Sequence, residues 1–221
     1  MPTDFESELL RQRNEMVQIQ LRKRGIHDER VLNAMAMVPR HEFVPWQLQR
    51  EAYRDSPVPI GEGQTISQPY IVAYMLQALR LHFEDEVLEV GTGTGYAAAV
   101  MSRIVREVYT IERFETLAGD ARKMFAQLGY ENVHVIVGDG SEGYASAAPY
   151  DAIVVAAAAP RVPEALLSQL KKGSRMVLPV GSSELQQLLL VTKHDGEVDR
   201  RYLDACRFVP LIGKQGYAVE H

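Results

Sequence analysis

A glycine-rich turn is the first feature of the sequence that could hold a ligand. The segment "VLEVGTGTGY" places Gly91, Thr92, Gly93 and Gly95 between a strand-like run and a helix-like run. Glycine allows a tight turn and a close approach of the backbone to a ligand, and the start of a helix offers free N–H groups. A nicotinamide-binding turn has the pattern G-x-G-x-x-G, whereas Tyr96 stands at the third glycine position here. The turn therefore predicts a ligand site but disfavours a nicotinamide dinucleotide.

Acidic residues stand at the ends of three successive strand-like segments, at Glu89, Glu112 and Asp139. A carboxylate accepts two hydroxyl hydrogen bonds, so Glu112 suits a ribose, and Asp139 beside Gly140 suits the amino group of an adenine. One such acid would usually be a solvated loop residue, but three beside a glycine turn predict a nucleoside site. The turn contains neither a P-loop lysine nor another basic residue that could bind phosphates. We therefore expect a nucleoside without phosphates, which favours S-adenosyl-L-methionine.

A polar loop, "GEGQTISQP", runs into an apolar helix-like segment that begins at Pro69. Proline suits the first helical position, so Ser67 or Gln68 stands near the N-cap. Free N–H groups, the positive end of the helix dipole and a serine hydroxyl would together hold an anion such as a carboxylate. The alternative is that Ser67 only caps the helix. The hydroxyls of this loop, on Thr65 and Ser67, are suited to hold such a group.

The elements that must position these residues belong to one predicted domain, residues 1–221. Residues 1–60 form a helical extension, residues 61–180 form the ligand-binding core, and residues 181–221 form C-terminal strands. In the core, strands alternate with helices, which is typical of a parallel sheet covered by helices on both faces. Two strand-like runs around Asp195-Gly196 predict an antiparallel pair at the end of the sheet. The fold class is therefore α/β, with a doubly wound and mostly parallel sheet.

Hydrophobic periodicity and turn residues set the expected bounds of these elements. The expected helices are 4–24, 29–38, 69–81, 96–105, 114–129 and 162–170, the last ending near Lys172-Gly173. The expected strands of the core are 86–90, 107–112, 133–137, 151–156 and 175–180. Residues 40–60 are expected to be irregular with a short helix, and residues 61–68 to form a loop, because prolines and glycines interrupt them.

The composition excludes several classes of protein. With 46% hydrophobic and 24% charged residues, the chain of 221 residues is globular, and its net charge of −5 argues against a nucleic-acid-binding surface. The longest apolar run, "AIVVAAAAP", is too short to span a bilayer, so no membrane association is expected. A single cysteine, Cys206, and an N-terminus without an apolar leader favour the cytoplasm. No His/Cys cluster suggests a metal site.

Several segments, taken in order, resemble the protein-L-isoaspartate O-methyltransferase family. "VLEVGTGTGY" is similar to motif I of the class I S-adenosylmethionine methyltransferases. The narrower resemblance spans about residues 20 to 213 and lies in "VPRHEFVP", "GQTISQPYIVAYM", "GDGSEGY", "APYDAIVVAAAAP", "QLKKGSRMVLPVG" and "RFVPL". "GQTIS" together with "APYDAI" is the most specific part of the match. The resemblance implies a Rossmann-like methyltransferase fold.

The resemblance also implies an activity. Members of this family transfer a methyl group from S-adenosylmethionine to the α-carboxylate of L-isoaspartyl residues in damaged proteins, and more weakly to D-aspartyl residues, leaving S-adenosyl-L-homocysteine. The methyl ester collapses to a succinimide, which reopens partly to normal aspartate. By this resemblance the loop of Gln64, Thr65, Ile66 and Ser67 lies beside the methyl donor and binds the acceptor, and Ser67 matches the family's usual active-site serine. The resemblance also implies that Glu112 and Asp139 hold the ribose and adenine. The tail "LIGKQGY" departs from the animal enzymes, so no donor contacts are carried over to it.

The residues fit this chemistry but leave alternatives open. A carboxylate is already ionised at neutral pH, so its methylation needs alignment and dehydration rather than a general base. The segment after the fourth strand, "AAAAP", indeed carries no acid, base or nucleophile. The alternatives are a methyltransferase with another acceptor, a non-catalytic module that binds S-adenosylmethionine and, more remotely, a nicotinamide oxidoreductase.

Overall fold

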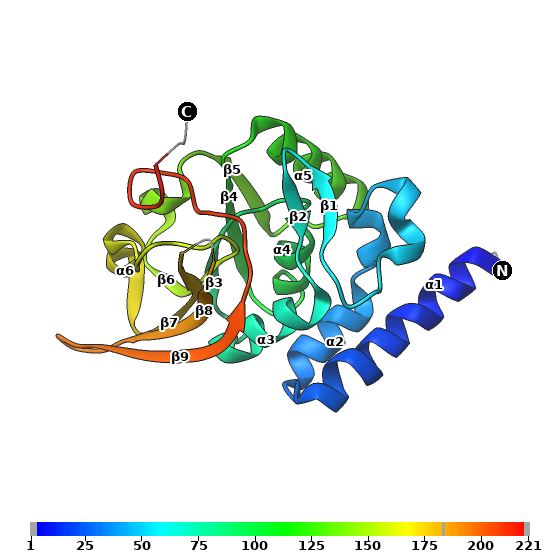
Figure 1. Cartoon of the computed structure of the whole chain (residues 1–221), viewed down its shortest axis with the longest axis horizontal. Coiled ribbons are helices and arrows are strands. Elements are labelled where there is room, and N and C mark those ends of the chain that lie inside the picture. Colours follow the sequence, from blue (N-terminus) through cyan, green and yellow to red (C-terminus); the bar gives the residue numbers. More distant parts are fainter. Residues whose placement is uncertain (1–3, 183, 219–221) are drawn as a thin grey trace.

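The computed structural model describes residues 4–182 and 184–218, so the outermost residues of the predicted domain lie outside the described chain. A seven-stranded sheet runs through the molecule in the order β5-β4-β3-β6-β7-β8-β9 (Figure 1). The first five of these strands are parallel, and β8 and β9 are antiparallel additions at one edge. The strands are β3 (Glu86–Val90), β4 (Glu107–Glu112), β5 (Val133–Val137), β6 (Tyr150–Val155), β7 (Leu170–Gly181), β8 (Gln186–Lys193) and β9 (Val198–Cys206). The predicted doubly wound sheet and its antiparallel end are confirmed.

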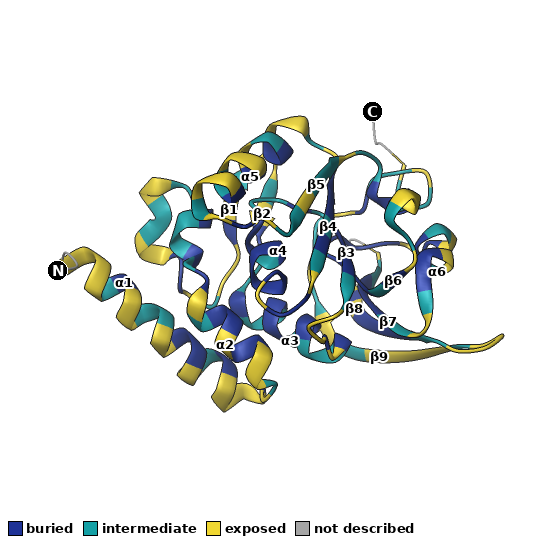
Figure 2. Ribbon diagram, turned by 180° about the vertical axis from the view of Figure 1, so that it is seen from behind, coloured by how far each residue is buried: buried dark blue, intermediate teal, exposed yellow. Residues whose placement is uncertain are grey.

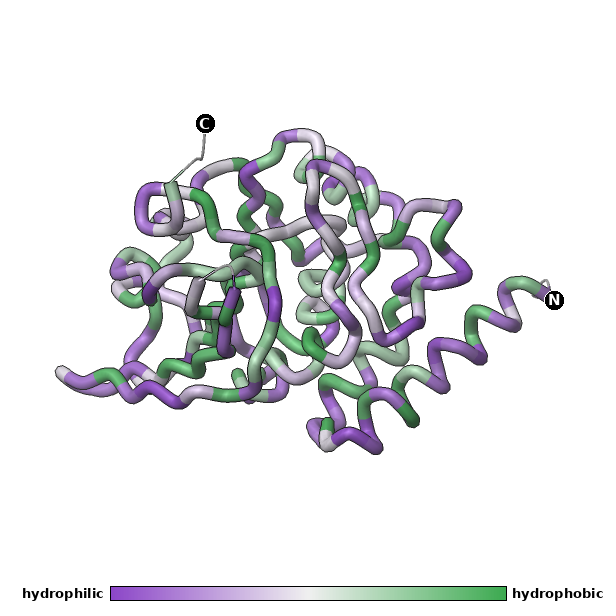
Figure 3. Tube along the Cα trace, viewed as in Figure 1, coloured by the Kyte–Doolittle hydropathy of each residue, from purple (hydrophilic) through white to green (hydrophobic). Residues whose placement is uncertain are grey.

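Helices cover both faces of this sheet. They are α1 (Asp4–Glu15), α2 (Glu29–Met37), α3 (Pro69–Leu79), α4 (Tyr96–Met101), α5 (Glu115–Leu128) and α6 (Glu164–Gln169). The first helix continues through a π-helical turn and a 3₁₀ turn to residue 24, where Gly25 ends it with a φ of 96°. The Asp28 side chain caps α2 by accepting a hydrogen bond from the Arg30 N–H. Helix α1 projects from the body of the protein and mixes hydrophilic with hydrophobic residues along its length (Figures 1 and 3).

Alternation along the strands divides the core into two layers. On β3, for example, Val87 packs into one hydrophobic cluster and Leu88 into the other, as the two-residue period of a strand requires. The first cluster joins the sheet to α2, α3, α4 and α5, and it includes Leu9 of α1. The second lies between the sheet and α6. Buried residues accordingly run along the middle strands, while much of α1 and β9 is exposed (Figure 2). The N-terminal extension is thus packed onto the face of the sheet that carries α3 and α4.

One element was missed from the sequence. The loop expected at residues 61–68 is largely a two-stranded antiparallel hairpin formed by β1 (Val58–Gly61) and β2 (Gln64–Ile66). Its two turn residues both have positive φ, 50° at Glu62 and 66° at Gly63. Such turns strongly favour Asn-Gly or Asp-Gly, and glutamate at the first position hides the signal. The segment expected to bind the acceptor is therefore a strand backed by a partner.

Three element ends also differ from the expected bounds. Helix α4 stops at Met101 rather than residue 105, and α3 ends at Leu79, where Arg80 caps it with a φ of 57°. Helix α6 ends at Gln169, and β7 begins at the next residue, so the expected helix end near Lys172-Gly173 is wrong. The buried Leu170 already belongs to β7, and no turn residue separates it from α6.

Candidate active site

A cleft lies at the carboxyl ends of β3, β4 and β6, where the order of the sheet reverses direction. Ligands of doubly wound folds bind at this switch point. The hairpin β1–β2, helix α3 and the C-terminal tail enclose the cleft. Of the residues that the sequence singled out, those lining it are Gln64, Thr65, Ile66, Ser67, Glu89, Gly91, Thr92, Gly93, Glu112 and Gly140. Two others, Gly95 and Asp139, do not line it.

The glycine turn needs its glycines for two different reasons. All three have positive φ, 96° at Gly91, 54° at Gly93 and 89° at Gly95, where other residues are strained. The first two face the cleft. A Cβ atom on Gly95 would come within 2.4 Å of the Phe125 ring on α5. Gly91 and Gly93 therefore bring backbone to the cleft, whereas Gly95 lets α4 start close against α5.

Glu112 ends β4 and is committed to the main chain around the cleft. One carboxylate oxygen accepts from the Gly93 N–H at 2.9 Å, and the other accepts from the Phe114 N–H at 3.1 Å. The side chain is buried, with 5% exposed. A carboxylate holds such N–H donors strongly because it is charged. Glu112 thus ties the glycine turn after β3 to the chain after β4, with its carboxylate at the cleft wall.

Glu89 lies deeper in the same cleft. Its side chain is 1% exposed and accepts a hydrogen bond of 2.5 Å from the Thr110 hydroxyl, which in turn lies 2.7 Å from the Thr92 hydroxyl. Burial raises the pKa of Glu89 to about 8, the nearby Glu112 adds to this, and the Thr110 hydrogen bond opposes it. A positively charged ligand in the cleft would favour the ionised carboxylate, because opposite charges attract strongly away from water.

Asp139 is turned toward the C-terminal tail. Its Oδ1 accepts from the Ser141 N–H and hydroxyl at 2.9 and 2.6 Å, and its Oδ2 accepts from the Lys214 N–H at 2.8 Å. Burial acts to raise the pKa of Asp139, but these hydrogen bonds lower it overall. Its neighbour Gly140 does face the cleft, and a Cβ there would meet Val90 Cγ1 at 2.4 Å. The predicted contact between Asp139 and an adenine stays a prediction.

Ser67 follows β2 and faces the cleft, but it does not cap α3. The N-cap residue is Gln68, and no side-chain cap hydrogen bond forms there. The Ser67 carbonyl accepts from the Arg40 guanidinium at 2.8 Å, while the Ser67 hydroxyl makes no hydrogen bond within the described residues. The interpretation of Ser67 as a helix cap therefore finds no support in the structure.

The start of α3 offers fewer free donors than the sequence suggested. Pro69 has no N–H, and the Tyr70 N–H donates to the Asp55 carboxylate at 3.3 Å. Asp55 lies only 15 residues earlier in the chain, but the intervening hairpin hid this contact from sequence reasoning. The first turn of α3 is thus partly occupied by a carboxylate of the protein itself, so an acceptor would depend chiefly on the β2 segment and Ser67.

Sequence reasoning missed one whole wall of the cleft. The tail pairs with the chain after β6, with Ala158 N–H donating to the Val209 carbonyl at 2.8 Å and Leu211 N–H donating to the Ala158 carbonyl at 2.7 Å. This places Phe208 to Ile212 along the cleft. Met75 of α3 is buried and also lines the cleft. The apolar stretch "RFVPL" was the available signal.

Comparison with known proteins decides the family. A family model described as protein-L-isoaspartate(D-aspartate) O-methyltransferase (PCMT) matches residues 11–216. The chain belongs to this family. The predicted enzyme class, activity and methyl donor of the chain are thereby confirmed. A methyltransferase with another acceptor and a non-catalytic module that binds S-adenosylmethionine are not favoured.

Relatives and solved structures agree with this placement. A protein-L-isoaspartate O-methyltransferase of Koribacter versatilis is 58% identical over 93% of each chain, and one of Petrotoga mobilis is 55% identical over 97% of this chain and 100% of that one. A solved protein-L-isoaspartate O-methyltransferase superposes with a TM-score of 0.83 at 32% identity, covering 92% of this chain and 67% of that chain. Another solved structure is that of a Plasmodium falciparum protein-L-isoaspartate O-methyltransferase (beta-aspartate methyltransferase) in complex with S-adenosyl-L-homocysteine. It superposes with a TM-score of 0.80 at 26% identity, covering 90% of this chain and 98% of that chain.

The described part of the chain offers neither a metal site built from several side chains nor a membrane-spanning helix. No group of three or more His, Cys, Asp or Glu side chains there could hold a metal ion. Among the same residues, no helix is both long and apolar enough to cross a membrane. Cys206 ends β9, and burial raises the pKa of its thiol to about 11, so the thiol is not an activated nucleophile.

Proposed function

We propose that this cleft aligns the α-carboxylate of an L-isoaspartyl residue with the methyl group of S-adenosylmethionine, and that Ser67 holds the acceptor. The observation that carries the proposal is the position of Ser67. Its hydroxyl is uncommitted and it lines the same cleft as the glycine turn. D-aspartyl residues, which present a similar carboxylate, would be weaker acceptors. The methyl ester then leads to the succinimide through which the damaged residue is repaired.

The chain has little covalent chemistry to perform. When bound, S-adenosylmethionine supplies an electrophilic methyl group on a sulfonium. The acceptor carboxylate, with a reference pKa of about 4, arrives ionised and needs no general base. What the residues must do is align the two groups and exclude water. The apolar side chains suited to exclude water are Ile66, Met75, Phe208, Val209 and Leu211, all lining the cleft.

On the donor side, we infer that the acids and the turn share the work. Glu112, with both oxygens already fixed by N–H groups, would accept from the ribose hydroxyls. The backbone of Gly91, Thr92, Gly93 and Gly140 would lie against the donor, with Gly95 setting the start of α4. Glu89 would face the positive charge of the donor. Asp139 would accept from the adenine amino group with a lone pair not used by Ser141 or Lys214.

The partners and the setting follow from the same proposal. The acceptors would be damaged proteins and peptides, and neither nucleic acid nor a membrane would be a partner. A cytoplasmic location is supported by the single cysteine, which suits a reducing compartment. The division into one domain, with residues 1–60 as an extension of the core, is supported by a hydrophobic cluster that joins both parts.

Replacing Ser67 with alanine tests the proposed acceptor role. We expect Ser67→Ala to lower kcat for an isoaspartyl peptide by about 100-fold, the usual loss when one preorganised donor is removed. Calorimetric titration should show unchanged affinity for S-adenosyl-L-homocysteine. Ser168→Ala is a matched control, because that hydroxyl donates to the Ala165 carbonyl on α6, away from the cleft. If Ser67→Ala keeps the kcat of the control, Ser67 does not hold the acceptor.

A further inference from the structure

Arg40, in the N-terminal extension, is fully buried. Its side chain has 0% exposed surface and is the largest of the fully buried side chains. Burial lowers the pKa of this guanidinium from its ordinary value. An arginine is rarely placed in such a position, since removing its charge from water is costly unless the group is well bonded. Arg40 is not among the residues that line the cleft.

The hydrogen bonds of Arg40 go to main-chain carbonyl oxygens. Its Nε donates to the Ala52 carbonyl at 2.7 Å, and its Nη2 donates to the Ser67 carbonyl at 2.8 Å. The first bond anchors the guanidinium to the turn that precedes the hairpin. The second bond reaches Ser67, the residue proposed to hold the acceptor. The planar fork of an arginine fixes the relative position of two acceptors in a way that a lysine cannot.

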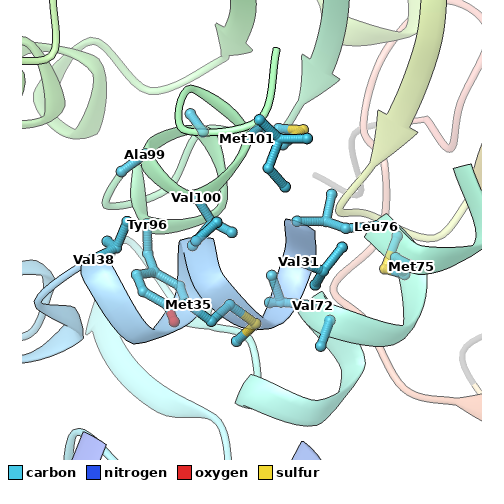
Figure 4. Close-up of a cluster of buried hydrophobic side chains, with 14 of the residues drawn as sticks. Val31, Met35, Val38, Val72, Met75, Leu76, Tyr96, Ala99, Val100 and Met101 are labelled. Atoms are coloured by element: carbon cyan, nitrogen blue, oxygen red, sulfur yellow. The ribbon is translucent and has the colours of Figure 1, made fainter. Parts of the chain in front are cut away.

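The same guanidinium also lies over a residue of the donor side. Its Cζ is 4.7 Å from the centre of the Tyr96 ring, a distance typical of a cation–π contact. Tyr96 is the first residue of α4, directly after the glycine turn, and it lines the cleft. Its side chain extends from α4 toward α2, beside Met35 (Figure 4). Arg40 therefore contacts, at one point, the segment of Ser67 and the segment that follows the donor turn.

Arg40 is not completely satisfied by these contacts. Its Nη1 and the Tyr96 hydroxyl are both buried without a hydrogen bond of ordinary geometry among the described residues. Burial raises the pKa of Tyr96 to about 12, and the nearby guanidinium opposes this rise. A side chain selected only for stability would be better replaced by an apolar one, because buried charges are often no more stabilising than well-packed hydrophobic groups. The imperfect bonding therefore directs attention to what the arginine holds in place.

We propose that Arg40 is a positioning residue for methyl transfer, which fixes the main chain of Ser67 relative to Tyr96 and so sets the distance between acceptor and donor. This inference rests on the proposed role of Ser67. Methyl transfer is in-line, and a displacement of about 1 Å at a reacting group can cost on the order of 100-fold in rate. Loss of the Arg40 contact would release Ser67 while leaving the donor turn, held by Glu112, intact.

Substitution of Arg40 tests the proposal. Arg40→Met keeps the length and apolar stem of the side chain but removes both hydrogen bonds. We expect it to lower kcat/KM for an isoaspartyl peptide by about 100-fold, with affinity for S-adenosyl-L-homocysteine changed by less than about threefold. Arg40→Lys, which can bond one carbonyl at a time, should recover part of the loss. This second variant keeps the test decisive if the first does not fold.

Gln20→Met is the matched control. The Gln20 amide donates to the Tyr53 carbonyl at 2.8 Å, so it anchors the same turn as Arg40 but has no bond to Ser67. If Arg40 served only to hold the N-terminal extension, both variants would lose activity equally and in step with their melting temperatures. We expect the control to keep near wild-type kcat/KM at temperatures where it is folded.

A double-mutant cycle with Ser67→Ala separates this inference from the proposed function. If Arg40 acts through Ser67, Arg40→Met should cost less than about fivefold in the Ser67→Ala background, against about 100-fold in the wild type. Losses that multiply would overturn the positioning role while leaving that of Ser67 in place. A Ser67→Ala enzyme with full activity would instead overturn the proposed function, and with it the basis for Arg40.

Discussion

Besides the tail, the cleft has two walls, which we propose bind the methyl donor and the acceptor. These two walls are built by different means. The donor wall consists of strand ends, with Glu89 and Glu112 carried by β3 and β4 of the central sheet. The acceptor wall is the small hairpin β1–β2, which is not hydrogen-bonded into that sheet. The hairpin is held instead by side chains from elsewhere, such as the Thr116 hydroxyl, which donates to Glu62 at 2.8 Å, and Arg40.

The difference between the walls matches the difference between the two substrates, the methyl donor and the protein acceptor. The methyl donor is one fixed molecule, and its wall has the rigidity of a parallel sheet buried on both faces. The acceptor is part of a larger and variable protein, and its wall is a hairpin outside the sheet that packs onto the hydrophobic core through Val58 and Ile66. Substitutions in the donor wall should therefore act on donor affinity, and substitutions in the acceptor wall on turnover.

The largest effect is expected at Glu112. Glu112→Ala leaves the Gly93 and Phe114 N–H groups without their acceptor and removes the proposed ribose contact. Loss of the two charge-assisted hydrogen bonds that the ribose hydroxyls would donate, about 3 kcal/mol together, corresponds to a donor Kd raised by about 100-fold. Calorimetric titration with S-adenosylmethionine measures the change directly.

The control for Glu112 is its neighbour Glu115, an exposed residue in the first turn of α5. Glu115→Ala should leave donor affinity as in the wild type. If Glu112→Ala instead lowered kcat for the peptide at an unchanged donor Kd, the assignment of β4 to the donor wall would be wrong.

A smaller, pH-dependent effect is expected at Glu89. Because the pKa of Glu89 is about 8 in the unliganded chain, binding of a cationic donor should expel its proton. Donor affinity should then rise with pH by up to about tenfold per unit and level off above pH 8, as proton linkage requires. Titrations in buffers of different ionisation heats should show the released proton, and Glu89→Gln should abolish the dependence. Affinity that is flat between pH 6 and 9 would contradict this.

The same group affects the stability of the unliganded chain. The pKa of Glu89 is higher in the folded state than its ordinary value of 4.5. Its contribution to the free energy of unfolding is therefore full below about pH 4.5 and is lost as the pH rises through about 8. Thermal melts across this range should show a steeper decline for the wild type than for Glu89→Gln.

The smallest effect is expected at Asp139, which sharpens the boundary between the donor wall and the tail. With one oxygen in place of two, Asp139→Asn cannot keep its three hydrogen bonds from Ser141 and Lys214 and also accept from an adenine amino group. Donor Kd should therefore rise by about fivefold, equivalent to about 1 kcal/mol. Lys214→Ala is the comparison, because it removes the ion pair of the tail with Glu142 at 3.0 Å but keeps the main-chain N–H that donates to Asp139. Equal effects of the two would assign Asp139 to the tail rather than to the adenine.

The donor wall could be predicted from the sequence because its signals are local. Buried strands with a two-residue period and a glycine turn placed Glu89 and Glu112 at the sheet edge, and the structure brings both into the cleft. Gly95 shows the limit, since it has the required positive φ but serves packing against Phe125. A glycine pattern does not distinguish ligand contact from close helix packing.

The acceptor wall could not be predicted in the same way, because its contacts are between distant segments. No local sequence signal near Ser67 indicates that Arg40 donates a hydrogen bond to its carbonyl, or that Asp55 accepts one from the Tyr70 N–H. The hairpin itself was hidden by Glu62 in a turn that usually carries asparagine or aspartate. Residues 208–212 reach the cleft only because they pair with the chain after β6.

A paired methylation assay tests the central claim most directly. Two peptides of identical sequence, one with an L-isoaspartyl residue and the other with normal aspartate, are incubated with the enzyme and S-adenosylmethionine carrying a labelled methyl group. The account predicts base-labile label in the isoaspartyl peptide and none above background in its twin. Equal labelling of the two peptides, or no labelling of either by an enzyme that binds the donor, would contradict it.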